Sequence, residues 1–565
     1  GLGPEENTWC APNTIQRDIG VISIDNKQHI NNGPSKKSKM LCVTGTSFMY
    51  PSHPSTAHYS VSSIEDVMTK VPQGRWDMQA FWDKYLDVKL VTDIVPCFGG
   101  FCTSLDSFDS DLVIMSPAEA RVLDVQHRSL LEAMSNAIND TCIVLRKGDD
   151  LNVPGCGVYV GISSTDFLLD HIKPTATELN AYILPGNVLS VAAGRLSYVF
   201  GLRGPSLAID TACSSSIVST HEASNGIRAN NTKAAASCGV TAIMSVLTTG
   251  LFSAAGMLSA DGRCKTLDAA ADGYVRGEAC GVIIIESSPR KTKSWLQVLF
   301  AGSSVNQDGR ASSLTAPHGP SQQAVIQTSL LNGSIIADDM SCLQLHGTGT
   351  ALGDPIEMGS IAAVCIKISK RQLPLTLEAV KSLLGHTETA AGIIGISQPV
   401  KRMAFALKQR IAHFVITSQH VYSVFSSGSR YSDNADISKI NTCRQSSSAV
   451  LRCARSICGV SGFAFQGTNG HCILSLMLNV ENVSVSGQSY HVTVLNRCRH
   501  WILPKAHALL RVTYLKSAFT SITQAVLDQR TCSFFWGHRL LQKPLFPMTG
   551  FCELALSGTL VDSLL

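Results

Sequence analysis

The feature that most constrains the fold of this chain is an alternation of short apolar runs with longer Ala-rich segments, which begins at Met40. The apolar runs have the length of strands: "MLCVTGTSF" (40–48), "GCGVYVGIS" (155–163), "GPSLAID" (204–210), "GVIIIE" (281–286) and "SCLQLHG" (341–347). The segments of helical length include "EMGSIAAVCIKISK" (357–370) and "TAAGIIGISQPVKRMAFALKQ" (389–409). This alternation predicts an α/β domain with mostly parallel sheets, which continues to about residue 475.

Four other segments lack the alternation. Residues 1–39 are polar and rich in Asn, Lys and Ser, which is typical of a leader or linker. Residues 402–458 include a long Ser/Asn-rich stretch, and we expect loop or irregular surface there. Residues 476–504 resemble a second linker, and residues 505–565 form a separate, incomplete piece. We find no internal repeat with a fixed period.

Composition narrows the functional classes. Charged residues make up 16% of the chain, below the roughly 25% of an average globular protein, which indicates extensive burial. The net charge is only +4, and the basic cluster "SKKSK" (35–39) fits a solvated linker better than a nucleic-acid site. No apolar run is long enough to span a membrane. The 19 scattered cysteines, never spaced C-x-x-C, indicate reduced thiols without a zinc or other metal site, in an intracellular, cytoplasmic protein.

The stretch "DTACSSS" (210–216) contains a candidate nucleophile. Cys213 follows an apolar run and precedes a helical segment, so the pattern places it in a strand-to-helix turn. The N–H groups and dipole of a helix N-terminus lower a thiol pKa from about 8.5 to roughly 3.5–7.5. We therefore expect a reactive thiolate, while a buried structural cysteine remains the alternative.

Two histidines lie in similar strand–loop–helix settings. His346 precedes a helix start in which Asp354 is the expected N-cap, followed by Pro355 and an acidic Glu357. His386 lies in "KSLLGHTETAAG" (381–392). One thiol and two imidazoles suit acyl transfer and acid–base chemistry on a thioester, although a lone loop histidine is usually only a polar surface residue. The motifs of serine hydrolases, phosphate loops, dinucleotide folds and zinc peptidases are absent.

These three stretches, with "HGTGTALGDPIE" (346–357) completing the second, occur in the order typical of β-ketoacyl synthases. The chain most resembles the ketosynthase domains of modular type I polyketide synthases over about residues 40–475. The resemblance implies a thiolase-like fold of two fused halves, about 40–290 and 291–475, in five αβαβα layers. It also implies a homodimer and a decarboxylative Claisen condensation in polyketide synthesis, with no bound cofactor.

The resemblance also implies roles for individual residues. Cys213 would accept an acyl chain from the phosphopantetheine arm of an acyl carrier protein. His346 and His386 would assist decarboxylation of a malonyl thioester and stabilise the resulting enolate. Lys381 and Glu388 match the supporting pair of the family.

Further positions match the substrate-binding parts of the family. Thr348 and Thr350 correspond to the residues that hold the pantetheine arm. The backbone N–H groups of Cys213 and Phe465 correspond to the oxyanion hole, in which loss of one donor typically costs about 100- to 1,000-fold in rate.

Four positions depart from the family pattern. Leu383 replaces an Asn, Val125 replaces a Pro, and Gln344 replaces a Glu. Gln466 replaces a Gly in the loop that carries Phe465. If that Gly requires a backbone conformation open mainly to glycine, Gln466 is expected to stiffen or distort the loop.

The last segment, 505–565, resembles the truncated start of a dehydratase with a hotdog fold. His538 matches its catalytic histidine, but the segment ends before the expected aspartate, so we expect an inactive piece, and an ordinary surface histidine remains the alternative. No acyltransferase follows the synthase, so extender units would be loaded in trans.

Three alternatives stay open at this point. A fatty-acid synthase condensing domain would share the same residues. A degenerate domain would keep the fold only as a dimeric scaffold or a docking surface for the carrier protein. A thiolase is a more distant alternative, because "HGTGT" is not its pattern.

Overall fold

The computed structural model describes the central part of the chain and several short strands beyond it. The described residues are 40–51, 66–72, 75, 98–103, 105–141, 155–170, 180–287, 296–367, 371, 373–405, 411–426, 440–442, 455–478, 498–499, 512–516, 521–524, 539–540 and 543–544. The chain divides into two units, 1–38 and 39–565. The predicted leader, its basic cluster and His538 lie outside the described residues.

One eleven-stranded sheet forms the framework, in the order β12-β11-β10-β13-β14-β9-β1-β8-β7-β5-β6. Its strands are β1 (Leu41–Met49), β5 (Cys156–Gly161), β6 (Ser206–Ile209), β7 (Ala234–Thr241), β8 (Ala279–Glu286), β9 (Leu296–Gln307), β10 (Cys342–Gln344), β11 (Leu375–Glu378), β12 (Ile440–Thr442), β13 (Arg455–Phe463) and β14 (Thr468–Leu478). The five apolar runs noted in the sequence correspond to β1, β5, β6, β8 and β10, so these strand predictions are confirmed.

The sheet contains the same five-stranded topology twice. The first half has the spatial order β6-β5-β7-β8-β1, and the second half has β11-β10-β13-β14-β9. If the strands of each half are numbered in chain order, their order across the sheet is 3-2-4-5-1 in both halves. In each half the third, second and fourth strands are parallel, and the fifth and first are antiparallel to their neighbours. A repeat therefore exists in the topology, although the sequence shows no fixed period.

The expectation of mostly parallel sheets was wrong. The ten neighbouring pairs divide equally between parallel and antiparallel. The physical reason lies in the connections: β13 and β14 are joined by a tight turn, which forces antiparallel pairing. The two halves also meet through a short antiparallel contact between β1 and β9, where Leu41–Val43 pair with Val298–Phe300.

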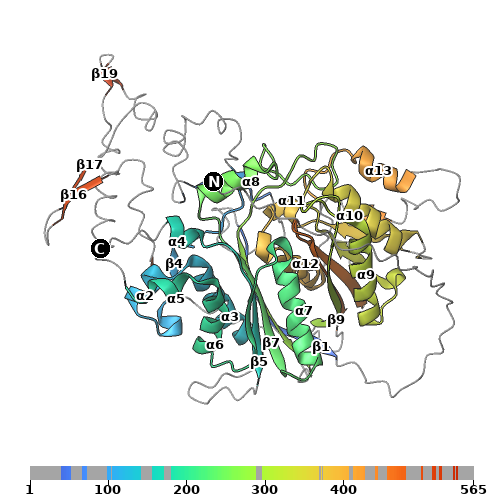
Figure 1. Cartoon of the computed structure of the whole chain (residues 1–565), viewed down its shortest axis with the longest axis horizontal. Coiled ribbons are helices and arrows are strands. Elements are labelled where there is room, and N and C mark those ends of the chain that lie inside the picture. The colour runs from blue at the N-terminus through green and yellow to red at the C-terminus, as the bar shows by residue number, and fades with distance from the viewer. Residues whose placement is uncertain are drawn as a thin grey trace, which may run out of the picture. The chain divides into compact units, whose positions relative to one another are not determined.

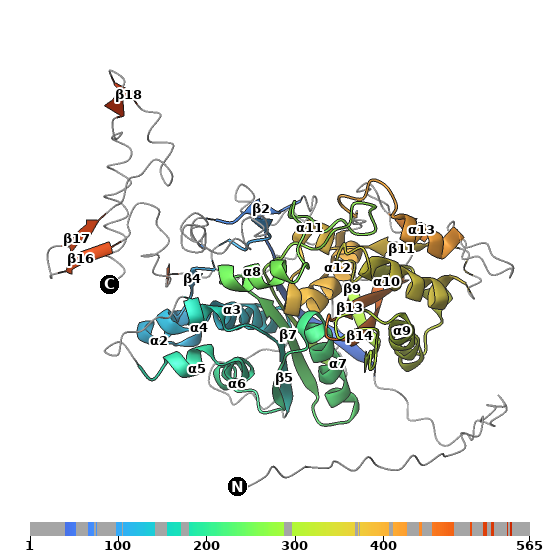
Figure 2. The ribbon, with the colours of Figure 1, turned by 45° about the horizontal axis from the view of Figure 1, so that its top comes forward.

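Helices cover both faces of each half and produce five layers. The helices α3 (Val125–Asp140) and α6 (Leu189–Val199) pack on the first half, and α9 (Gly319–Gly333) and α10 (Gly353–Ile361) belong to the second. Between them lie α7 (Ser215–Arg228) and α12 (Ala391–Phe405), which contact strands of both halves. Figure 1 shows α7 and α12 between the two outer groups, and Figure 2 shows the same order from a second view. The five-layer prediction is confirmed.

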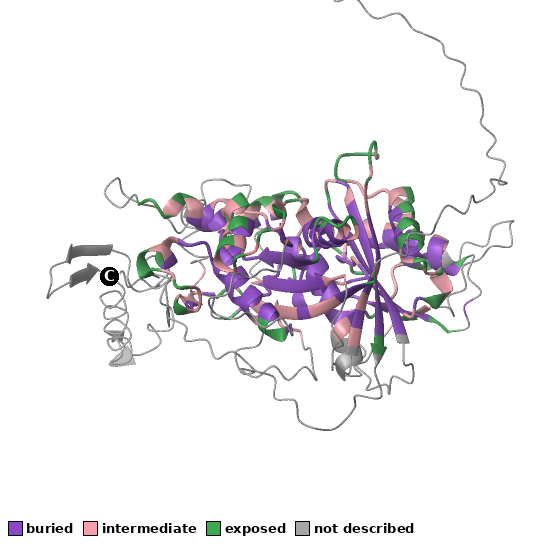
Figure 3. Cartoon of the chain, turned by 90° about the horizontal axis from the view of Figure 1, so that it is seen from below, coloured by how far each residue is buried: buried purple, intermediate pink, exposed green. Residues whose placement is uncertain are grey.

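The central layer contains the largest apolar core. Residues from both halves meet there, including Ile217 of α7, Ile393 of α12 and Ile283 of β8. A Cβ on Gly392 would lie 2.3 Å from the Ile217 side chain, so glycine permits the close approach of α12 to α7. Figure 3 shows the strands and central helices mostly buried, with exposed residues on the outer helices and loops. The two turns that precede α7 and α12 are thereby held on a rigid base.

The segment 402–458, predicted as loop, contains regular structure. Helix α13 (Gln419–Ser426) lies within it, as does β12. Val421 is buried and, with the half-buried Val424, packs on the outer core of the second half. This apolar spacing of three residues was hidden by the surrounding serines.

The remaining elements are short. They are β2 (Thr69–Lys70), β3 (Phe98–Gly99), β4 (Ser107–Phe108), α2 (Pro117–Val122), α4 (Asp166–Asp170), α5 (Ile183–Asn187), α8 (Val246–Ala254), α11 (Lys381–Leu384), β15 (Cys498–Arg499), β16 (Val512–Lys516), β17 (Ser521–Gln524), β18 (Arg539–Leu540) and β19 (Lys543–Pro544). Two hairpins, β16–β17 and β18–β19, lie in the predicted dehydratase-like piece. Two hairpins do not distinguish a hotdog fold, so that prediction stays a prediction. Among the described helices, none has the length and apolar character of a membrane span.

Candidate active site

Cys213 lies in a strained turn between β6 and α7. The turn is a short 3-10 helix, η2 (Ala212–Ser214), and Ala212 has a φ of 52°, a left-handed conformation that alanine rarely adopts. The Asp210 carboxylate accepts the Ala212 N–H at 3.0 Å, and the Ser215 hydroxyl accepts the Thr211 N–H at 2.9 Å. The predicted strand–turn–helix setting of Cys213 is confirmed, and its neighbouring side chains hold the turn.

The electrostatic environment of Cys213 differs from the prediction. Burial, and after it the charge of Glu388, raise the pKa of its thiol to about 12. Lys381 and the backbone N–H groups of Phe465 and Cys213 act in the opposite direction. The predicted lowering of this pKa by the helix N-terminus was wrong, because desolvation outweighs the favourable groups. The thiol is therefore protonated at neutral pH, although the side chain is only half-buried.

His346 is held from both sides by backbone and carboxylate groups. Its Nδ1 accepts the Phe463 N–H at 3.2 Å, which leaves the proton of the neutral ring on Nε2. Its own backbone N–H donates to Glu357 at 2.7 Å, and the Gly347 N–H donates to the same carboxylate at 2.8 Å. The loop after β10 is thus clamped onto α10.

His386 is completely buried and is held in the same tautomer. Its Nδ1 accepts the Glu388 N–H at 3.1 Å, so the proton lies on Nε2. Its backbone pairs with a neighbouring segment: the His386 N–H donates to the Val275 carbonyl at 2.6 Å, and the Gly277 N–H donates to the His386 carbonyl at 2.8 Å. The Tyr274 ring meets it edge-on, with centroids 4.9 Å apart.

The two imidazole rings lie next to each other. Their ring centroids lie 5.6 Å apart and their planes are nearly perpendicular, at 89°. Burial lowers the pKa of both rings well below 6.5, and the Lys381 charge lowers it further, so both are neutral at pH 7. The His386 Nε2 is buried and has no hydrogen-bond partner within the described part of the chain. An unpaired buried donor of this kind marks a place for a ligand acceptor.

Asp354 and Glu357 serve the histidine loop instead of capping their own helix. Helix α10 begins at Gly353, so the predicted N-cap at Asp354 was wrong. The Asp354 carboxylate accepts the N–H groups of Leu267 and Gly349, and burial raises its pKa to about 6. Both carboxylates therefore anchor backbone that leads to or from His346.

Lys381 is buried beneath this loop. Desolvation lowers the pKa of its ammonium group. Among the nearby charges, that of Glu357 does most to favour the charged form of the lysine. Burial in turn raises the pKa of Glu357. These two groups form the charged layer that supports His346, and the role of Glu357 was not foreseen from the sequence.

Glu388 pairs with Arg276, a residue that the sequence analysis did not single out. The guanidinium approaches both carboxylate oxygens, at 2.5 and 3.1 Å, and also donates to the Thr249 hydroxyl at 2.7 Å. The signal that could have revealed it was an arginine in "GYVRGEACG" (273–281), directly before an apolar run of strand length. Turn η5 (Glu388–Ala390), which carries Glu388, contacts η2 and thus the turn of Cys213.

Thr348 and Thr350 lie in the loop directly after His346. Their hydroxyl oxygens are 3.4 Å apart, and Thr350 also accepts the Gly353 N–H at 3.1 Å. Thr348 is buried and Thr350 is half-buried. The predicted role of this pair in holding a pantetheine arm stays a prediction.

The departures from the family pattern are accommodated differently. Leu383 is buried in the central core, and Val125 is buried at the first position of α3, after the N-cap Asp124. Gln344 is buried, and neither of its side-chain polar atoms finds a partner among the described residues. Only this third change carries a visible energetic cost.

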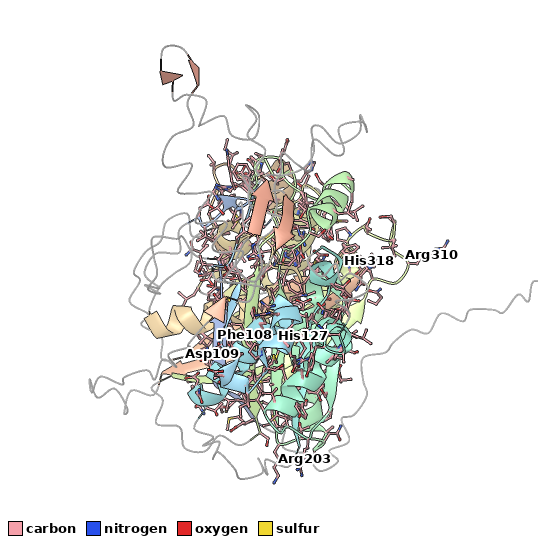
Figure 4. All side chains as sticks on the ribbon, turned by 90° about the vertical axis from the view of Figure 1, so that its left-hand side faces the viewer. Phe108, Asp109, His127, Arg203, Arg310 and His318 are labelled. Carbon is pink, nitrogen blue, oxygen red and sulfur yellow. The ribbon has the colours of Figure 1, made fainter. Side chains whose placement is uncertain are left out.

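A buried imidazole alone does not define the site. His127 is also buried, and neither ring nitrogen has a partner in the described part of the chain. It lies on α3 in the outer layer, and Figure 4 shows it within the body while Arg203 and Arg310 project from the edge. Within the described ranges no group of three or more His, Cys, Asp and Glu is placed to hold a metal ion.

Two family models match the chain. The model "Beta-ketoacyl synthase, N-terminal domain" matches residues 39–290, and "Beta-ketoacyl synthase, C-terminal domain" matches residues 298–415. Together they span more than half of the chain, and they carry Cys213, His346 and His386.

Similar proteins include components of large synthases. A phenolphthiocerol/phthiocerol polyketide synthase of Mycobacterium tuberculosis (strain CDC 1551 / Oshkosh) is 33% identical over 82% of this chain and 25% of its own length. The pikromycin polyketide synthase component PikAII of Streptomyces venezuelae is 34% identical over 73% of this chain and 11% of its own length. The chain therefore spans a quarter or less of these relatives.

Solved structures agree with the observed fold. The ketosynthase from module 6 of the bacillaene synthase from Bacillus subtilis 168 has a TM-score of 0.63 and 26% identity, over 77% of this chain and 72% of that one. An oxazolomycin ketosynthase domain from Streptomyces albus JA3453 has a TM-score of 0.66 and 24% identity, over 77% and 74%. The likeness establishes the thiolase-like fold.

Proposed function

The chain belongs to the β-ketoacyl synthase family, and we propose that it catalyses a decarboxylative Claisen condensation in polyketide synthesis. Residues 40–475 form the synthase in this proposal, with halves at about 40–290 and 291–475. The observation that carries it is the pair of neutral imidazoles, His386 buried and His346 half-buried, whose Nδ1 atoms are both occupied by backbone N–H groups. Both Nε2–H groups are then donors for one oxyanion beside a thiol.

The first step loads an acyl chain on Cys213. The Cys213 sulfur attacks the carbonyl carbon of a carrier-bound thioester, and the N–H groups of Cys213 and Phe465 stabilise the oxyanion. The bond to the pantetheine sulfur then breaks. The thiol proton leaves with that sulfur as a new thiol, so the step balances. Because the resting thiol is protonated, attack and proton loss are coupled.

The second step forms the carbon–carbon bond. A malonyl thioester loses CO₂, and the electron pair of the broken bond passes into an enolate whose oxygen accepts hydrogen bonds from His346 and His386. The enolate carbon attacks the acyl carbon, and Cys213 leaves as a thiolate that takes a proton from solvent, so the condensation consumes one proton overall. The acyl chain, longer by two carbons, remains on the carrier. Neutral imidazoles suit this role because they donate without protonating the carbanion.

The substrates in this proposal are tethered to acyl carrier protein. Phosphopantetheine is the arm of the substrate, and Thr348 and Thr350 hold it. Lys381 and Glu388 act as supporting groups through the electrostatics described above.

A second copy of the chain is the expected structural partner. Strand β6 is at the edge of the sheet and pairs with β5 alone among the described strands. Leu207 on β6 is 45% exposed, and Leu247 and Leu251 on α8 are also exposed. An open edge strand with exposed leucines favours pairing with another chain.

The test is the intact mass of the purified chain after incubation with a short acyl-pantetheine thioester. We expect an acyl adduct that maps to Cys213 and disappears in Cys213→Ala, followed by product formation with malonyl carrier protein. A folded chain that forms no adduct would contradict the proposal and favour a scaffold role.

A further inference from the structure

The turn between β13 and β14, here called the Phe465 turn (residues 463–468), borders both reactive groups. Phe463 donates its N–H to His346, and the Phe465 N–H faces the Cys213 thiol. A Cβ on Gly462 would lie only 3.8 Å from the Cys213 carbonyl oxygen. An acyl group on Cys213 therefore shares its space with this turn, and a larger acyl group must displace it.

Gln466 fits the turn without backbone strain. It is not among the described residues with a positive φ, whereas the following Gly467 has a φ of 94°. The expected distortion at Gln466 is thus absent. The side chain instead stiffens the turn, because its Oε1 accepts both the Thr468 N–H and the Thr468 hydroxyl, each at 3.0 Å.

The same turn is fastened to the end of β9. The Gln307 side chain donates to the Gln466 carbonyl at 3.1 Å, and the Asp308 N–H donates to the Gly467 carbonyl at 2.9 Å. The Asn469 side chain donates to the Asp308 carboxylate at 2.6 Å. These bonds involve backbone or residues outside the turn, so a glycine at position 466 would keep them and lose only the two bonds of the Gln466 side chain.

We propose that Gln466 is a specificity-determining residue that latches the Phe465 turn and favours short acyl chains. This inference rests on the proposed function. The Phe465 ring is 43% exposed while its backbone is held, so small acyl groups can be accepted without opening the turn. Longer chains require breakage of the Gln466 bonds. Removal of two neutral hydrogen bonds shifts such an opening equilibrium by roughly 5- to 100-fold.

The experiment compares three full-length chains: wild type, Gln466→Gly and Gln466→Glu. The glutamate keeps an acceptor at the same reach and is the matched control. Two readouts are taken: amide hydrogen exchange of the 463–468 segment, and the rates at which acetyl- and octanoyl-pantetheine acylate Cys213. We expect Gln466→Gly to exchange faster and to gain about fivefold or more with octanoyl, while acetyl stays within about twofold. Gln466→Glu should resemble wild type in both.

Each other outcome is decisive. Unchanged exchange in Gln466→Gly would overturn the latch, and faster exchange with equal gains for both thioesters would overturn the selective role. A Gln466→Glu chain that behaves like Gln466→Gly would show that the acceptor is irrelevant. If no chain forms an acyl-Cys213 with either thioester, the proposed function fails and the selective role with it, while the exchange rates still decide whether Gln466 latches the turn.

Discussion

The two halves of the molecule build the same turn and use it differently. In the first half, β6 leads through Cys213 into α7, and in the second, β11 leads through His386 into α12. Each turn contains a non-glycine residue with a positive φ, Ala212 at 52° and Glu388 at 42°. Strain of this kind, at equivalent points of a repeated topology, is consistent with two turns built to present a side chain toward a common space.

The halves differ in what supports those turns. The turn of Cys213 is held by short hydroxyl and carboxylate side chains, and its thiol is kept neutral by burial. The second half inserts α11 with the buried charge of Lys381, and carboxylates clamp the backbone around His346. The comparison indicates that the turn of Cys213 in the first half presents a neutral nucleophile without burying a charge. The second half buries charged groups, and these hold the two histidine donors in position.

The largest expected effect is that loss of a histidine impairs decarboxylation but not acylation of Cys213. His346→Ala or His386→Ala should lower malonyl decarboxylation by about 100- to 10,000-fold, because a positioned donor is lost. Acylation of Cys213 should change little, since its nucleophile and N–H donors remain. Release of labelled CO₂ measures decarboxylation, and the intact mass of the chain measures acylation of Cys213. Exposed His420→Ala on α13 is the control, and equal losses in both steps would contradict the division of labour.

Glu357→Gln tests the charged support of the second half. The variant weakens the bonds to the His346 and Gly347 N–H groups, and hydrogen bonds to charged groups contribute about 1.5–3 kcal/mol. We expect condensation to fall by about 10- to 100-fold and stability in urea to decrease. The matched control is Glu119→Gln, which breaks the more exposed ion pair with Arg195 in the first half. A surface pair of that kind contributes about 0–1 kcal/mol, so comparable losses from the two variants would refute the argument.

The pH dependence of stability should be opposite for the two groups of side chains. The native pKa values of His346 and His386 lie well below the unfolded value of 6.5, so only the unfolded chain gains their protons as the pH falls. Stability should therefore decrease below pH 6.5, by up to about 1.4 kcal/mol per pH unit for each ring. The native pKa of Cys213 is about 12 against 9.0, so its contribution is lost as the pH rises from 9 toward 12.

Urea unfolding from pH 5 to 10 measures both slopes. His386→Ala should flatten the acid slope and leave the alkaline slope unchanged, and Cys213→Ala should do the reverse. An acid slope that is identical in wild type and His386→Ala would show that His386 is not held neutral. Other buried thiols, such as Cys264, also contribute above pH 9, so the comparison is between variants and not between absolute slopes.

The two strained turns should respond to glycine in opposite directions, and Ala212→Gly has the smallest expected effect. Ala212→Gly relieves a left-handed conformation that costs an L-residue about 1–2 kcal/mol, partly offset by the flexibility of glycine when unfolded, so stability should rise by about 0.5–1 kcal/mol. Glu388→Gly relieves the equivalent position but removes the partner of buried Arg276, and stability should fall by about 3–5 kcal/mol. Thermal or urea unfolding measures the free energy of unfolding of both variants. A stability gain in both would refute the structural role of the Arg276–Glu388 pair.

Much of the framework could be predicted because its signals are local. Apolar runs of strand length led to β5, β8 and β10, and the motif residues could be placed in turns before helices. The helix α13 was missed because it is only eight residues long and is followed by a Ser/Asn-rich stretch. The direction of strand pairing was missed because it depends on whether each connection is a tight turn or a crossover to the other end of the sheet. The residues of a single strand do not encode this difference.

The sequence by itself determined which reactive groups are present, Cys213, His346 and His386, and that each lies in a turn or loop that precedes a helical segment. Only the tertiary structure decided their protonation and mutual position. Folding brings the charges of Lys381 and Glu388 close to Cys213, from which they are distant in sequence, and desolvation raises the thiol pKa where local reasoning predicted a decrease. A pKa depends on everything within a few ångströms in space, and most of those neighbours are far away along the chain.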